Sequence, residues 1–150
     1  MSGYLLDTNV VSMLAPSRTD APAPFLAWLE RMDRDGRLFL SVVTVHEIER
    51  GVAPLERNGA SAKAAALKAW LAGLLATYGD NILGLDAPVA SLSGRLEAKG
   101  LAGGVDSGMA DAIVAGIAQA HDLVVVTCNA KHFLPFGVSL ATPDDITAKS

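Results

Sequence analysis

The apolar residues of the chain fall into two kinds of segment that alternate along its length. Short runs that are apolar at almost every position predict buried strands, and they span 4–7, 38–41, 82–85, 123–127 and 138–141. Longer segments repeat apolar residues every three or four positions or are rich in Ala and Leu. They predict helices over 10–14, 25–34, 42–53, 60–78, 87–99 and 108–121.

This order of strands and helices predicts an α/β fold. The strands are continuous apolar runs, which is typical of a mainly parallel sheet of four to five strands covered by helices on both faces. The chain has 150 residues, no internal repeat and no long linker. We therefore expect a single domain over residues 1–150.

Polar residues and prolines mark where the helices begin and end. Ser41 and Asp86 are suited to cap the helices that follow them, and Thr8 or Asn9 to cap the short helix over 10–14. Pro54 is expected to end or bend the helix that starts at residue 42. Residues 15–24 contain three prolines and residues 100–107 three glycines, so both segments are expected to be loops.

Composition narrows the possible functions. Hydrophobic residues make up 51% of the chain, but no apolar run approaches the roughly 18 residues of a spanning helix. The first residues lack the pattern of a signal peptide, so we expect a cytoplasmic protein without membrane contact. The net charge of −4 argues against wholesale coating of nucleic acid. This net charge is still compatible with an enzyme that contacts nucleic acid over a small area.

Several polar side chains are expected to meet at one edge of the sheet. Asp7 ends the first strand, and Thr127 and Asn129 follow the fourth. Ligand groups of α/β sheets gather beyond the carboxyl ends of the strands. Glu47 and Asp111, each on a predicted helix, are placed to reach the same edge.

Asp111 is the strongest of these signals, because it is the one carboxylate of an otherwise apolar helix. Structural roles are the alternative: Asp7 caps a helix, Glu47 is solvated, and Asp111 pairs with a distant arginine. Carboxylates gathered without a cation repel one another strongly. A divalent ion relieves this repulsion, and ligands that are all oxygen select Mg²⁺ or Mn²⁺.

Four segments in order resemble the PIN-domain ribonucleases, and most closely the VapC and FitB-like toxins of bacterial toxin–antitoxin pairs. They read LLDTNVVS, SVVTVHEIERG, ADAIVAGIA and VVVTCNAKHF. The resemblance implies an α/β/α sandwich and an endoribonuclease that depends on Mg²⁺ or Mn²⁺. Asp7, Glu47 and Asp111 match the first three acids of the family. Asn129 matches the Asp or Asn of its TR[DN] turn.

In this interpretation Asp7 and Asp111 are metal ligands, and Glu47 is a direct or water-mediated ligand and a candidate base. Around them, Thr8, Asn9 and Thr127 are expected to orient the acids or water, and Asn129 is a candidate for the fourth position. Two nearby positions differ from the family pattern: Cys128 replaces the usual arginine, and His132 falls where many members carry Asp. Arg50 and Lys131 are candidates for RNA contact.

The resemblance also implies partners: an RNA substrate, a cognate antitoxin and a second copy of the chain. The Ala- and Leu-rich segment 60–78 offers a face for the homodimer or for an antitoxin segment. This face carries Leu67, Trp70, Leu71, Leu74 and Leu75.

Two other functions compete with the ribonuclease. A haloacid-dehalogenase-like phosphatase also places an aspartate at the end of its first strand, but it requires a second aspartate where this chain has Asn9. An inactive PIN-fold binding domain is the alternative that is not an enzyme. The intact set of Asp7, Glu47 and Asp111 argues against it.

Overall fold

A five-stranded sheet forms the centre of the computed structural model, which describes residues 3–149. The strand order is β3-β2-β1-β4-β5, and every neighbouring pair is parallel. The first strand of the chain therefore lies in the middle of the sheet. The strands are β1 (Gly3–Leu6), β2 (Leu38–Ser41), β3 (Ile82–Leu83), β4 (Leu123–Val126) and β5 (Leu140–Ala141).

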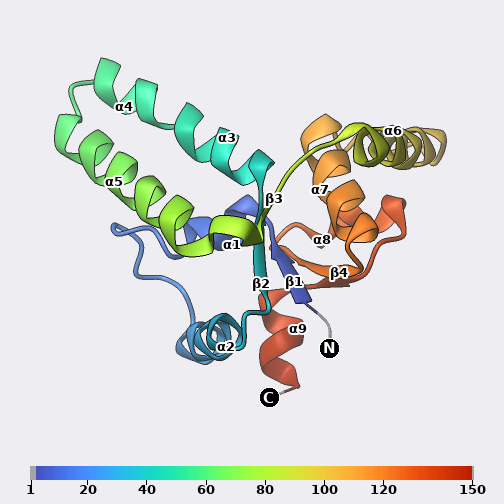
Figure 1. The fold of residues 1–150 in the computed structure, drawn as a ribbon, viewed down its shortest axis with the longest axis horizontal. Coiled ribbons are helices and arrows are strands. Elements are labelled where there is room, and N and C mark those ends of the chain that lie inside the picture. Colours follow the sequence, from blue (N-terminus) through green and yellow to red (C-terminus); the bar gives the residue numbers. More distant parts are fainter. Residues whose placement is uncertain (1–2, 150) are drawn as a thin grey trace.

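Helices cover both faces of this sheet (Figure 1). They are α1 (Thr8–Ser12), α2 (Ala23–Arg34), α3 (Val42–Arg50), α4 (Val52–Arg57), α5 (Ser61–Tyr78), α6 (Ala87–Ala102), α7 (Met109–Ala120), α8 (Ala130–Phe133) and α9 (Pro143–Ala148). Two 3-10 turns, η1 (Gly79–Asn81) and η2 (Leu134–Phe136), join α5 to β3 and continue α8. Among residues 3–149, no helix combines the length and apolar character that crossing a bilayer requires.

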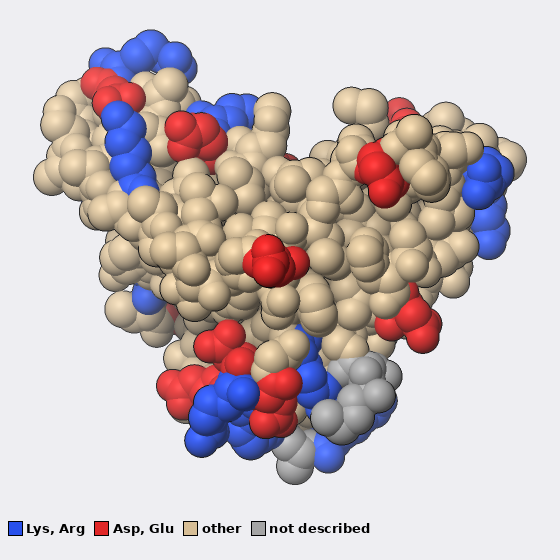
Figure 2. Space-filling model, in the orientation of Figure 1, with Lys and Arg blue, Asp and Glu red and all other residues tan. Residues whose placement is uncertain are grey.

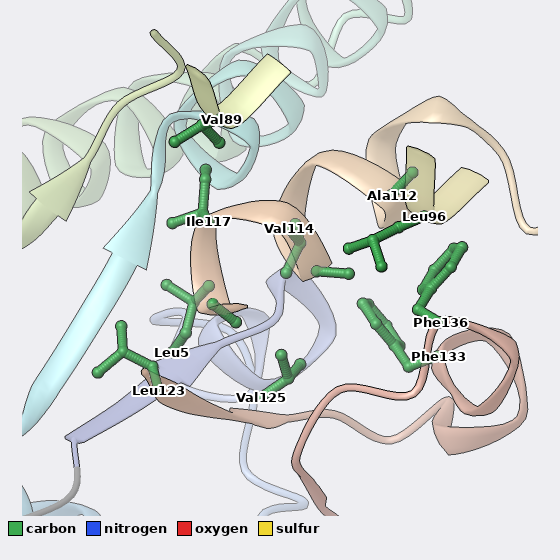
Figure 3. Close-up of a cluster of buried hydrophobic side chains, with 12 residues drawn as sticks. Leu5, Val89, Leu96, Ala112, Val114, Ile117, Leu123, Val125, Phe133 and Phe136 are labelled. Carbon is green, nitrogen blue, oxygen red and sulfur yellow. The ribbon is translucent and has the colours of Figure 1, made fainter. Parts of the chain in front are cut away.

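Successive residues of the central strand serve two separate cores. Leu5 packs with residues of α6 and α7 and with Phe133 and Phe136 (Figure 3). Leu6 belongs to the other core, which α1, α2, α3 and α5 cover. This division confirms the predicted α/β/α sandwich, because each strand must be apolar on both faces to fill two cores.

The helices form two lobes above the sheet with a notch between them. In Figure 1, α3, α4 and α5 project on one side, and α6 and α7 lie on the other. The notch holds a groove of about 410 Å³, and the hollow is visible in Figure 2. Its lining comes from α3, α7 and the segment after β3: Val42, Val43, His46, Glu47, Arg50, Leu85, Met109, Ala110 and Ile113.

Several helix boundaries differ from the sequence-based expectation. Asp7, rather than Thr8 or Asn9, is the N-cap of α1, because the chain leaves the strand at Leu6 and turns at once into the helix. The helix that starts at residue 42 ends before Pro54, at Arg50. Pro54 instead lies in the first turn of α4, where its missing N–H costs no hydrogen bond.

The N-caps Ser41 and Asp86 were predicted correctly, and the short helices α8 and α9 were missed. Ser41 and Asp86 cap α3 and α6, accepting hydrogen bonds from the N–H groups of Thr44 and Val89. Helix α9 was not predicted, although Thr142 and Asp145 form a capping box at its start.

Candidate active site

Asp7 lies where two parallel strands end side by side. Leu6 pairs with Val126, and the N–H of Asp7 donates to the Val126 carbonyl over 2.9 Å. Thr127, which directly follows β4, donates its hydroxyl to Asp7 Oδ2 over 2.8 Å. The predicted convergence of these two strand ends is therefore present in the structure.

The Asp7 carboxylate is almost fully buried and accepts further hydrogen bonds from its own turn. Its side chain caps α1 by accepting from the Thr8 N–H over 3.0 Å, and Asn9 Nδ2 donates to Oδ2 over 3.2 Å. Burial is the main cause that raises the pKa of Asp7, and it outweighs the opposing hydrogen bonds from Thr127 and Thr8. The carboxylates of Asp111 and Glu47 raise this pKa further, so the three acids share one electrostatic environment.

Glu47 reaches this edge from α3 and is tied to the turn after β1. Thr8 Oγ1 lies 2.6 Å from Glu47 Oε1, to which it donates, and 2.9 Å from the hydroxyl of the buried Thr44. Thr8 thus contacts the second acid, while its own N–H binds Asp7. One residue of α1 therefore positions two of the predicted acids.

Asp111 lies in the first turn of α7, and its partner is a histidine rather than the arginine of the structural alternative. His132 Nδ1 lies 3.2 Å from Asp111 Oδ2. The backbone of His132 is fixed in turn, because Ser107 Oγ donates to its carbonyl over 2.6 Å. Burial raises the pKa of Asp111, His132 opposes this, and Glu47 adds to it.

The sequence did not reveal the contact between His132 and Asp111. His132 was noted only for its place in the VVVTCNAKHF segment, and these two residues lie 21 positions apart on different helices. The signal that could have indicated this contact is the position of His132, three residues after Asn129 and close to the same strand end. The structure places His132 beside Asp111, and Asn129 stays the candidate for the fourth position.

The remaining predicted residues take different places around this edge. Asn9 accepts from the Cys128 N–H over 3.1 Å, and Asn129 is exposed and contacts Thr127 through its own N–H over 2.9 Å. Arg50 lines the notch beside Glu47. Lys131 is exposed on α8, next to His132.

Asp7, Glu47 and Asp111 are the three candidate ligands for a divalent ion. None of the three carboxylates forms a salt bridge with lysine or arginine inside the described range 3–149. That same range contains no three Asp, Glu, His or Cys side chains already arranged to hold a metal ion. The chemistry of the donors still fits a hard cation, because all three are carboxylates and the charge of Glu47 raises the pKa of both Asp7 and Asp111.

Raised acid pKa values make the stability of the metal-free protein depend on pH. Asp7 binds its proton more tightly in the folded state, so its contribution to stability is present at low pH and is lost as pH rises through the folded pKa. In EDTA, we expect the free energy of unfolding of the wild type to fall as the pH rises above about 3.9. This fall is expected to be steeper than in Asp7→Asn, by up to about 1.4 kcal/mol per pH unit. Urea unfolding across this range measures both slopes, and equal slopes would contradict the expectation.

Comparison with known proteins agrees with this architecture. The chain matches the PIN domain over residues 4–134. It is 31% identical over 139 residues to Toxin FitB of Neisseria gonorrhoeae, covering 93% of this chain and 96% of FitB. It is 29% identical over 140 residues to VapC ribonuclease Y4jK of Sinorhizobium fredii, with the same coverage of 93% and 96%.

Comparison with solved structures agrees with the comparison of sequences. The crystal structure of FitAcB from Neisseria gonorrhoeae contains a chain that superposes with a TM-score of 0.78 at 31% identity, covering 93% of this chain and 97% of that one. The chain therefore belongs to the PIN-domain family. Within that family it is similar to the FitB and VapC toxins.

Proposed function

We propose that the chain is a divalent-metal-dependent endoribonuclease and the toxin of a cytoplasmic toxin–antitoxin pair. The observation that supports this proposal is that three carboxylates from three elements lie near the carboxyl end of a parallel sheet and act on one another electrostatically. Asp7 follows β1, Glu47 comes from α3, and Asp111 comes from α7. The ribonuclease name of the relative Y4jK supports RNA as the substrate.

Asp7, Asp111 and Glu47 are the residues that would hold the ion, Mg²⁺ or Mn²⁺. When bound, such an ion polarises the scissile phosphate and lowers the pKa of the attacking water. The protein contributes the positions of the acids: Thr127 and Asn9 hold Asp7, Thr8 holds Glu47, and His132 holds Asp111. Glu47 is the candidate base, and Arg50 and Lys131 are the candidates for contact with the RNA backbone.

Metal removal tests the proposal. We expect the purified chain to cleave RNA with Mg²⁺ or Mn²⁺, to stop cleaving in EDTA, and to resume when the ion is restored. Calorimetry of the free protein is expected to show one weak site or none, because no set of ligands is already assembled in the part that the structure describes. Cleavage that persists in EDTA contradicts the proposal, and two tight Mn²⁺ sites without RNA would reveal a ligand we have not assigned.

The alternative functions make different predictions in the same assay. A haloacid-dehalogenase-like phosphatase would form a covalent phosphate on Asp7 and leave RNA intact. The structure disfavours this chemistry, because Asn9 occupies the place of its second acid and donates to Asp7. An inactive PIN-fold binding domain would show no metal-dependent reaction at all.

We also propose that the chain pairs with a cognate antitoxin and with a second copy of itself. On the face of α5 expected for these partners, Leu71 is buried and Leu75 is 43% exposed. Leu67, Trp70 and Leu74 are partly buried against the same core as Leu6. Further exposed apolar side chains line the notch: Val42, Leu85 and Met109, the last 68% exposed. Apolar surface of this kind favours a protein partner.

Light scattering tests the partners. We expect a mass of two chains for the protein alone and a larger complex after co-expression with the product of the adjacent gene. A matched variant, Met109→Lys, places a charge in the notch and is expected to weaken at least one of these associations. A strict monomer in both preparations would contradict the proposal.

A further inference from the structure

The partner of Asp111 differs in kind from the partners of the other two carboxylates. Asp7 and Glu47 are held by hydroxyl, amide and backbone N–H groups, which do not bind metal ions through nitrogen. Asp111 Oδ2 instead lies 3.2 Å from His132 Nδ1, and imidazole is a common metal ligand. The side chains of His132 and Asp111 are 55% and 23% exposed, so an ion can reach both from solvent.

The distance within this pair suits two ligands of one ion. Carboxylate oxygen and imidazole nitrogen ligands lie about 2.1 Å from ions such as Mg²⁺ and Zn²⁺. Two such ligands at a right angle to each other are therefore about 3.0 Å apart. The observed 3.2 Å is close to this separation and lies at the long end of the range for a hydrogen bond. An ion can thus replace the proton between the two side chains with little change in their separation.

The backbone of His132 is fixed, whereas its exposed ring is able to turn. The His132 carbonyl accepts from Ser107 Oγ over 2.6 Å, and the His132 N–H donates to the Asn129 carbonyl over 3.0 Å. The next residue, Phe133, is completely buried in the core beside α6 and α7 (Figure 3). Among the described residues no three ligands are already arranged around one point, so the site is completed by rotation of exposed side chains such as His132.

The other two histidines of the chain are placed differently. His121 follows the last residue of α7, at the opposite end of this helix from Asp111. His46 lines the notch together with Glu47 and is exposed. His46 is therefore the competing source of a nitrogen ligand, and a test has to separate it from His132.

We infer that His132 adds a nitrogen ligand to the ion held by the three carboxylates, and that the site therefore prefers Mn²⁺ to Mg²⁺. Imidazole binds first-row transition ions, whereas Mg²⁺ prefers sites made of oxygen ligands. A site of carboxylates alone discriminates little, since these ligands suit both ions. The inference rests on the proposed function, because it specifies which ion the same three carboxylates would hold.

Pulsed electron paramagnetic resonance of bound Mn²⁺ tests the inference on the full chain, because it detects nitrogen bonded to the ion without any cleavage reaction. The protein is stripped with EDTA, dialysed and kept in excess over Mn²⁺, so that even a weak site takes up the ion. Samples with ordinary and with ¹⁵N-labelled histidine assign the coupling to imidazole. The variants are His132→Gln, its matched control His46→Gln, and His132→Asp, which supplies an oxygen ligand instead. Both histidines are exposed, so these substitutions are expected to leave the fold intact.

We expect a histidine nitrogen coupling in the wild type and in His46→Gln, and none in either His132 variant. Competition between the two ions should show the ratio of Mn²⁺ to Mg²⁺ affinity falling about tenfold in His132→Asp and not in His46→Gln. Bound Mn²⁺ without this coupling, a coupling that depends on His46, an unchanged affinity ratio in His132→Asp, or no uptake of Mn²⁺ overturns the inference. RNA cleavage decides the proposed function separately: metal-dependent cleavage without the coupling refutes only the role of His132, and the coupling without cleavage by any ion refutes only the nuclease.

Discussion

Asp7→Asn and Asp111→Asn are each expected to abolish metal-dependent RNA cleavage while leaving the fold intact. The amide has the shape of the carboxylate but no charge, so it cannot offset a divalent cation. Replacing a residue that only supports a metal ligand typically costs 10–100-fold in metal affinity or activity. Replacing a ligand itself should therefore cost more than about a hundredfold in activity. Cleavage of a labelled RNA under Mn²⁺, together with circular dichroism, measures both effects.

The control for this experiment is Asp80→Asn. Asp80 is exposed in the turn after α5, away from the strand ends that carry the site, and the substitution changes the charge by the same amount. We expect cleavage close to wild type. Wild-type rates in both Asp7→Asn and Asp111→Asn would show that the reaction, if present, uses other residues.

Phe133→Ala is expected to cause the largest loss of stability, about 3–5 kcal/mol. Phe133 is 0% exposed and packs edge to face on Phe136 with centroids 6.0 Å apart, in the core beside α6 and α7 (Figure 3). Truncation removes a ring from a packed core and leaves a cavity. Urea unfolding in EDTA measures the loss without a contribution from bound metal.

The neighbouring residue provides the matched control. Leu134 is 67% exposed, so Leu134→Ala should change the free energy of unfolding by no more than about 0.5 kcal/mol. Equal effects of the two substitutions would mean that α8 is not packed as described. Because Phe133 follows His132, the less stable variant is also expected to lose the contact that holds Asp111.

The parts that the sequence predicted well are those with strong local signals. Continuous apolar runs such as 123–127 form strands in the structure. A strand that is buried on both faces carries apolar residues without the alternation of apolar and polar positions. The topology then brought Asp7 and Thr127 together, since neighbouring parallel strands end at one edge. Glu47 and Asp111 also lie on helices, as predicted.

The parts that were missed depend on tertiary contacts or on short signals. No periodicity links His132 to Asp111, which meet only after α7, β4 and α8 have packed. The hydroxyl of Thr8 reaches Glu47 across 39 positions. Whether the α5 face binds a partner stays a prediction: apolar residues at helical spacing do not reveal which of them another helix covers, and here Leu71 is buried whereas Leu75 is exposed.

The central position of β1 has a consequence during synthesis. Its neighbour β4 begins 120 residues later, since Gly3 pairs with Leu123, and Thr127 reaches Asp7 only after the same interval. Ribosomes add about 5–20 residues per second, so the first strand waits several seconds for its partner. A nascent chain therefore carries Asp7 without Asp111 or Thr127, and the proposed nuclease cannot act on the messenger from which it is still being translated.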